Sequence, residues 1–416
     1  MPRTATVALW LLGALVCASC ECDGDPPAPP SLHVERRRTL GPPRPELGGF
    51  FPLPMATDGH TVIAGQRDRD NRLHLFAIGL EAGGAAVLVE RPEAASPGVF
   101  FGRAAAIDGS LLVVGATDID GVGDVRGEAH VFARDDDGWR HVQRVHPESH
   151  APTERLGFGT AVAIGPRHVA VGAPGASGGG LVFLFRRAGD GALSEPRTIA
   201  PPAGDEVRRF GAALALDGRT LVVGAPADGD DRRRPGCAVV FDLEARTYDV
   251  LEVEHLAAGS KLGAAVALSG DRVAIGAPLA GRLHATGARH RDGGIGEVHA
   301  YRRGAEGWRH EACFQPADVE ALSFFGRALA MDDTRLVVGA PGAHVRDRRR
   351  PGAAYLFAAT HEGWSPALAF GAETPIGGDG YGAQVGIADR AVLVAANESG
   401  LSDPERLGRI EVFEIR

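Results

Sequence analysis

Three arginine-rich segments are the residues of this sequence whose type and spacing best suit binding chemistry. The hexapeptide DRRRPG occurs at 231–236 and again at 347–352, and GARHRDGG lies between them at 287–294. A guanidinium group donates paired hydrogen bonds that match carboxylate, sulfate and phosphate groups. The segments predict an anionic ligand site formed by Arg232, Arg233, Arg234, Arg289, Arg291, Arg348, Arg349 and Arg350. The alternative is that these arginines only supply solubility in a lysine-poor chain.

One acidic segment could hold a hard cation. In TDIDGVGD, at 117–124, Asp118, Asp120 and Asp124 alternate with small residues, as in a loop that wraps calcium. The alternative is a solvated acidic loop, and no other cofactor is expected. Beyond the first 22 residues only Cys237 and Cys313 remain, too few for a zinc site or a disulfide scaffold. We expect both to be small buried apolar residues, with an exported disulfide as the alternative.

The search for catalytic motifs gives no candidate residue. GASGG at 175–179 formally matches the hydrolase nucleophile pattern around Ser177, but that pattern requires a strand, a turn and a helix. Its surroundings here predict a glycine loop after a strand. His141, His146 and His150 lack the spacing of a metal-binding helix, and we expect them to be exposed on an outer strand and its loop.

A repeated unit is the element that must position all these segments. FGAALALDGRTLVVGAP, starting at Phe210, has close relatives along the chain, and aligning them gives seven starts about 50 to 60 residues apart, a spacing typical of propeller blades. These starts are Phe51, Phe101, Phe158, Phe210, Leu262, Phe325 and Tyr381.

Each unit predicts four short strands. In the fourth unit a small, alternating strand AALAL is followed by a turn at Asp217-Gly218, which readily takes positive φ angles. The apolar run TLVVGA then indicates a strand buried on both faces, and Pro226 takes the chain out of the sheet. A variable loop leads to GCAVVFDL, and the fourth strand is the least regular.

The fold predicted from these units is an all-β, seven-bladed β-propeller of four-stranded blades. Small first-strand residues suit the crowded central axis, the aromatic residue at each start fills the wedge between blades, and its glycine permits close backbone approach. The last unit ends at its third strand, and SLHVERRRTL near the beginning resembles the missing one. We therefore predict that residues 32–40 complete the last blade and close the ring.

These units resemble the FG-GAP repeat, whose two signatures stand here as Phe210-Gly211 and Gly224-Ala225-Pro226. The resemblance covers nearly all of residues 32–416 and implies a propeller similar to that of integrin α subunits, in the variant of bacterial surface and secreted proteins. It also implies a cell-surface binding or adhesion module. Family members often carry an Asp-rich calcium loop between the first two strands. Here that connection is a two-residue turn, so those calcium sites are not expected.

The first 31 residues predict export. Residues 1–19 carry an apolar run of signal-peptide length, and VCASC resembles a bacterial lipobox, which implies that Cys20 becomes the lipidated first residue. Cys17 departs from the lipobox pattern, so ordinary secretory cleavage is the alternative. Residues 20–31 are charged and Pro-rich, which indicates a tether. We expect an envelope lipoprotein at the outer membrane or cell surface, or a secreted protein.

Charge and motif content favour a binding protein. The formal net charge of −9 argues against a general nucleic-acid binder, and membrane contact is expected only through the lipid anchor. The leading hypothesis is an exported, non-catalytic binding or adhesion module that uses one loop face of the propeller for an acidic polysaccharide or a protein. The alternatives are an exported propeller enzyme, such as a glycosidase or lyase, and a structural envelope protein.

Overall fold

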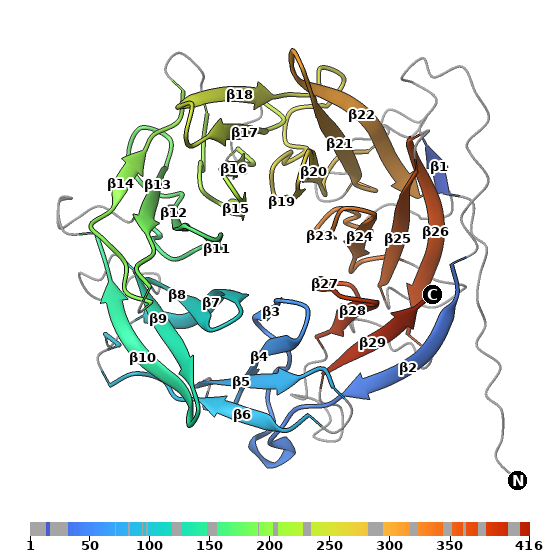
Figure 1. Cartoon of the computed structure of the whole chain (residues 1–416). Coiled ribbons are helices and arrows are strands. Elements are labelled where there is room, and N and C mark those ends of the chain that lie inside the picture. Colours follow the sequence, from blue (N-terminus) through green and yellow to red (C-terminus); the bar gives the residue numbers. More distant parts are fainter. Residues whose placement is uncertain are drawn as a thin grey trace, which may run out of the picture.

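The computed structural model shows seven antiparallel sheets, six of four strands and one of five, arranged radially around a central opening (Figure 1). It describes residues 14–16, 32–70, 72–81, 84–93, 95–96, 99–118, 127–147, 156–189, 191–202, 207–227, 234–281, 294–316, 323–343, 352–360, 363–372, 380–397 and 408–416. No helix of these residues is both long and apolar enough to cross a membrane. The predicted seven-bladed β-propeller is confirmed.

Apart from β1 and β2, which are described below, the strands of each blade follow chain order from the axis outward. Blade one contains β3 (Met55–Thr57), β4 (Thr61–Arg67), β5 (Leu73–Gly79) and β6 (Ala86–Val89). Blade two contains β7 (Val99–Asp108), β8 (Leu111–Asp118), β9 (Glu128–Asp135) and β10 (Gly138–Val145). Blade three contains β11 (Val162–Ile164), β12 (His168–Ala173), β13 (Leu181–Arg186) and β14 (Arg197–Ile199).

The remaining blades follow the same scheme. Blade four contains β15 (Ala213–Asp217), β16 (Thr220–Ala225), β17 (Cys237–Asp242) and β18 (Thr247–Leu251). Blade five contains β19 (Ala265–Ser269), β20 (Arg272–Ala277), β21 (Glu297–Gly304) and β22 (Gly307–Pro316). Blade six contains β23 (Ala328–Met331), β24 (Arg335–Ala340), β25 (Ala353–Thr360) and β26 (Gly363–Gly371). Blade seven contains β27 (Val385–Ala388), β28 (Ala391–Ala396) and β29 (Arg409–Ile415).

The first long strand closes the ring, as predicted. β2 (Val34–Leu40) pairs antiparallel with β29 and forms the outer strand of blade seven, so segments from both ends of the sequence share one sheet (Figure 1). A short 3-10 helix (Pro45–Leu47) then leads toward blade one. A further strand, β1 (Ala14–Val16), pairs with the outer edge of β22 in blade five. It lies inside the segment predicted to be a signal peptide, which stays a prediction.

The hydrophobic core is divided among the seven seams between blades. Each buried apolar cluster draws its residues from two neighbouring blades. The aromatic or leucine residue at every repeat start is buried in one of them, as predicted. Because burial comes from neighbours, one blade cannot shield its own faces from water.

Glycines allow the backbones of adjacent blades to meet. Gly263, which follows the repeat start of blade five, has φ +90°. A Cβ added to Gly224 of β16 would lie 2.1 Å from the Gly263 carbonyl oxygen. That separation is far below van der Waals contact, so the repeated glycines at these positions are required by the seam.

The connections of the blades define two faces of the ring. The loops from strand two to strand three and the connections from strand four to the next blade emerge on one face, which we call the loop face. The tight turns between strands one and two and between strands three and four lie on the other, the hairpin face. Gly218 and Gly270, in first hairpins, have φ of +54° and +55°, as the predicted two-residue turns require.

Candidate functional site

Three arginines from alternate blades lie at the loop-face starts of innermost strands, around the central opening. Arg103 belongs to β7, while Arg209 and Arg327 lie just before β15 and β23. All three adjoin the Phe-Gly pair that begins an innermost strand, and all three are exposed. Blades two, four and six are not neighbours, so these side chains can influence one another only across the opening.

The charges of two of these arginines affect the pKa of the third. Desolvation by the surrounding protein, followed by the positive charges of Arg327 and Arg209, lowers the pKa of the exposed Arg103 guanidinium. Like charges held near one another raise the free energy of the unliganded protein, and an anion between them lowers it. Among the described residues neither Arg103 nor Arg327 forms an ion pair, so the opening can accept carboxylate, sulfate or phosphate groups.

A pocket of about 220 Å³ lies at the loop-face end of blade four, between the connections that precede and follow this blade. Its polar wall contains Arg208, Arg234, Glu252 and Glu254, and its apolar wall includes Cys237. The Arg234 guanidinium lies 4.0 Å from the Glu252 carboxylate, which partly compensates its charge. The pocket therefore suits a small group with both anionic and donor atoms, or the end of a longer chain.

Most of the predicted site residues lie outside the described residues. Of the eight predicted arginines only Arg234 is described, at the wall of this pocket. Asp118 ends β8. The others, together with the predicted lipidation site, are outside the described ranges: Cys20, Asp120, Asp124, Arg232, Arg233, Arg289, Arg291, Arg348, Arg349 and Arg350. The arginine loops and the acidic cation loop therefore stay predictions.

The other sequence candidates are placed by the structure. Ser177 lies on an exposed turn between β12 and β13, which confirms that its motif lacks the strand-turn-helix setting of a nucleophile. Cys237 and Cys313 are buried thiols, as predicted. His146 is exposed, and His150 lies outside the described residues.

The expectation for His141 was wrong. Its ring is half-buried, and its Nε2 lies 3.1 Å from Nδ1 of the fully buried His130. His130 Nε2 lies in turn 2.9 Å from a carboxylate oxygen of Glu128. Strand pairing causes the difference, because β10 folds back on β9 and brings its histidine over the middle of the blade.

Blade five repeats this arrangement. His310 Nε2 lies 3.2 Å from His299 Nδ1, and His299 Nε2 lies 3.4 Å from Glu297 Oε2. His255, in the connection after β18, places its Nε2 3.2 Å from the same oxygen. Within the described part of the chain, His255, Glu297 and His299 are the group whose donor atoms could hold a metal ion. The sequence signal was GEAHVF followed by WRH, and GEVHAY followed by WRH, which sequence reasoning overlooked.

The pKa values of these clusters follow from burial and from their partners. Burial opposes ionisation of Glu297, but the close contacts and charge of His299 and His255 hold its pKa below the usual value. The balance is similar at Glu128, where His130 and a backbone N–H overcome burial. Burial and the neighbouring histidines lower the pKa of His310 to about 4, so this ring stays neutral near pH 7.

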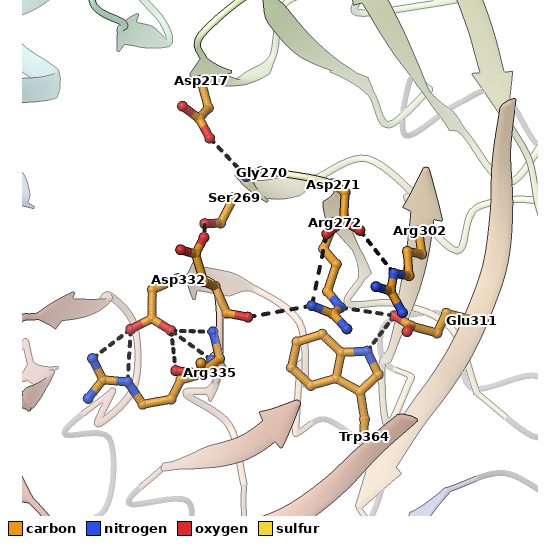
Figure 2. A network of polar contacts seen from close by, with 12 residues as sticks. Asp217, Ser269, Gly270, Asp271, Arg272, Arg302, Glu311, Asp332, Arg335 and Trp364 are labelled. Carbon is orange, nitrogen blue, oxygen red and sulfur yellow. Dashed lines mark hydrogen bonds and ion pairs between the residues drawn. The ribbon is translucent and has the colours of Figure 1, made fainter. Parts of the chain in front are cut away.

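Polar side chains on the hairpin face join the blades to one another. Figure 2 shows the network over blades four to six, in which the Gly270 N–H donates to Asp217 at 2.8 Å and the Ser269 hydroxyl donates to Asp333 at 2.6 Å. Further out, Trp364 Nε1 donates to Glu311 at 2.8 Å. These carboxylates are occupied in bridging neighbouring blades, so this region of the hairpin face has a structural role.

The fold and its strand order define this chain as a seven-bladed β-propeller closed by a strand from the beginning of the sequence. Residues 194–241 and 308–357 match the FG-GAP repeat model. The chain is therefore a seven-bladed propeller that contains FG-GAP repeats, a fold that suggests a binding or adhesion module. No curated protein matches it.

Two solved propeller-type structures are similar over most of the chain at low identity. One is the β-propeller domain of the Trilobed protease from Pyrococcus furiosus, with 11% identity, coverage of 88% of this chain and 96% of that chain, and a TM-score of 0.46. The other is a subtype N11 neuraminidase-like protein of A/flat-faced bat/Peru/033/2010 (H18N11), with 11% identity, coverage of 82% and 95%, and a TM-score of 0.40.

Proposed function

We propose that this chain is an exported, lipid-anchored, non-catalytic binding module that takes an acidic polysaccharide on its loop face. The observation that carries the proposal is the placement of Arg103, Arg209 and Arg327 around the central opening, where the charges of Arg327 and Arg209 act on Arg103. A repeating anionic chain offers several carboxylate or sulfate groups at once, and so matches cations contributed by separate blades.

The contrast between the two faces supports this choice of surface. In the network of Figure 2, carboxylates of the hairpin face bind donors of neighbouring blades. On the loop face, cationic side chains occur both at the opening and at the pocket with Arg208 and Arg234. The sequence predicts that the arginine loops, which lie outside the described residues, belong to this same face. An anionic ligand could therefore contact the opening and the rim together.

Export and anchoring are supported by sequence features. The apolar run of residues 1–19, the VCASC segment with Cys20, and the Pro-rich residues 20–31 are consistent with a propeller tethered to a membrane. A tether would leave either face of the ring accessible to large ligands.

The test compares ligand binding by the parent protein and two triple variants. The first variant is Arg103→Ala/Arg209→Ala/Arg327→Ala. The matched control removes three exposed arginines elsewhere, Arg140, Arg167 and Arg309, and so changes the net charge equally. Binding to polygalacturonate, dextran sulfate and neutral dextran is measured at low and high ionic strength.

We expect the parent to bind one or both anionic polymers, more weakly at high salt, and to ignore neutral dextran. At about 1 kcal/mol per lost charge-assisted contact, the Arg103/Arg209/Arg327 variant should bind the polymer about 100-fold more weakly than the parent, while the affinity of the control stays within about threefold of the parent. Equal losses of affinity in the two variants would show that only the net charge matters and would refute the proposed site.

A further inference from the structure

The cluster of His255, Glu297 and His299 in blade five lies apart from the arginines of the central opening. Glu297 and His299 are two residues apart on β21, so their side chains share one face of the strand. His255 reaches them from the connection between blades four and five. The three residues run from solvent to interior: His255 is 53% exposed, Glu297 13% and His299 not at all.

Two of the three separations between donor atoms match those of a tetrahedral metal centre. Glu297 Oε2 lies 3.2 Å from His255 Nε2 and 3.4 Å from His299 Nε2, and all three atoms lie within 4.8 Å of one another. Zinc bonds of 2.0 to 2.1 Å place tetrahedral ligand atoms about 3.3 to 3.4 Å apart. A cation could therefore join these atoms with only a small shift of the exposed His255.

His299 is oriented as a metal ligand would be. Its Nδ1 lies 3.2 Å from His310 Nε2, a contact that holds the plane of the ring. Its Nε2 is buried and has no hydrogen-bond partner, although it points toward the Glu297 carboxylate. A ligating imidazole in proteins commonly has its second nitrogen held by such a contact. This buried nitrogen without a hydrogen-bond partner is the observation that points to a bound cation.

Blade two shows how the same arrangement is satisfied without a metal. Glu128 and His130 occupy the positions of Glu297 and His299, but Ser96 replaces the third histidine. The Ser96 N–H and hydroxyl donate to the two Glu128 oxygens at 2.9 and 3.0 Å. Arg144 lies 3.7 Å from the same carboxylate. Blade two thus supplies donors where blade five supplies a second imidazole.

We propose that His255, Glu297 and His299 bind one divalent transition-metal cation of the zinc type, with a fourth coordination position open to solvent beside His255. Two imidazoles and one carboxylate favour such a cation over calcium or magnesium, which prefer oxygen ligands. The bound cation joins the connection after β18 to β21 and so stabilises the seam between blades four and five. This site is separate from the polysaccharide site and does not depend on it.

The experiment titrates zinc chloride into the tag-free, chelator-treated protein by isothermal calorimetry, and follows the melting temperature with and without zinc. The variant is His255→Ala, which changes an exposed side chain and so leaves folding intact. The matched control is His60→Ala, on the exposed hairpin between β3 and β4. Glu297→Gln serves as a second ligand variant, and calcium replaces zinc in a parallel titration.

We expect one equivalent of zinc per chain in the parent and in His60→Ala, with a higher melting temperature when zinc is bound. His255→Ala and Glu297→Gln should bind zinc at least tenfold more weakly and lose the shift in melting temperature. No zinc uptake by the parent, equal affinity in His255→Ala and His60→Ala, or equal affinity for calcium would overturn the proposal.

Discussion

A buried ion pair on the closing strand makes ring closure measurable. Arg37 of β2 contacts Glu411 of β29 at 2.5 Å, with side-chain exposures of 17% and 3%. Glu411 also accepts hydrogen bonds from the Tyr381 hydroxyl at 2.7 Å and from Arg409 at 3.1 Å. The closing strand therefore supplies part of the charge that compensates a nearly buried carboxylate.

The perturbation is Arg37→Ala. Removing one partner of a buried ion pair costs about 3 to 5 kcal/mol of unfolding free energy, because the other charge is left uncompensated. Here Arg409 and Tyr381 still contact Glu411, so we expect a loss of about 2 to 3 kcal/mol. In a Glu411→Gln background no charge is left behind, and the same substitution should cost about 1 kcal/mol. The double-mutant cycle thus has an expected coupling of about 1 to 2 kcal/mol.

The same strand offers a matched control. Glu35 of β2 pairs with Arg416 at 2.7 Å, but these side chains are 40% and 75% exposed. Exposed pairs are worth about 0.2 to 1 kcal/mol, so Glu35→Ala should have a small effect. Urea unfolding followed by circular dichroism gives the free energies of all five proteins. If Arg37→Ala costs no more than Glu35→Ala, or if the cycle shows no coupling, the reasoning about closure is refuted.

Three further predictions test the seam between blades, the half-buried His168 and the lipid anchor. Gly224→Ala should lower the free energy of unfolding by about 3 kcal/mol or more, since its Cβ would lie 2.1 Å from the Gly263 carbonyl oxygen. The control is Gly371→Ala, whose Cβ would have no atom within 4 Å, and equal urea midpoints for the two variants would contradict the close approach. The pKa of His168 is lowered by burial and then by three nearby arginines, against a smaller opposing effect of Glu244. Since its folded-state pKa lies below the unfolded value, its contribution to stability is present above pH 6.5 and is lost as the pH falls. His168→Gln should therefore lose less free energy of unfolding than the parent between pH 7 and pH 5, and equal losses in the two proteins would contradict this. Cys20→Ser should abolish incorporation of radiolabelled palmitate during expression in bacteria, and full labelling of the variant would rule out the predicted anchor.

The periodic features of the sequence were enough to predict the fold. The sequence contains seven in-phase starts, a glycine in the turn after the first strand of five units, and a buried second strand. These features depend on contacts within one unit or between similar units. The missing fourth strand of the last blade could likewise be matched to residues 32–40, because a closed ring leaves only one place for it. The structure confirms this assignment at Arg37 and Glu411, which lie on the two strands that meet.

The candidate sites depended on distances that no repeat pattern contains. Arg103 and Arg327 stand beside the Phe-Gly pair, and the sequence offered FGR as their only signal. Their interaction with Arg209 exists because the closed ring turns three separate repeats toward one axis. His299 and Glu297 share a strand face by simple alternation, but His255 comes from the connection of another blade and joins them only through packing.

The sequence by itself determined the all-β architecture, the number of blades, the seam residues and the closing strand, because local periodicity and the need to bury sheet faces allow few other solutions. The tertiary structure alone decided which charges meet across the opening and which histidines converge on Glu297. Those outcomes depend on the radius of the ring and on the paths of individual connections, which are set by packing of all seven blades together.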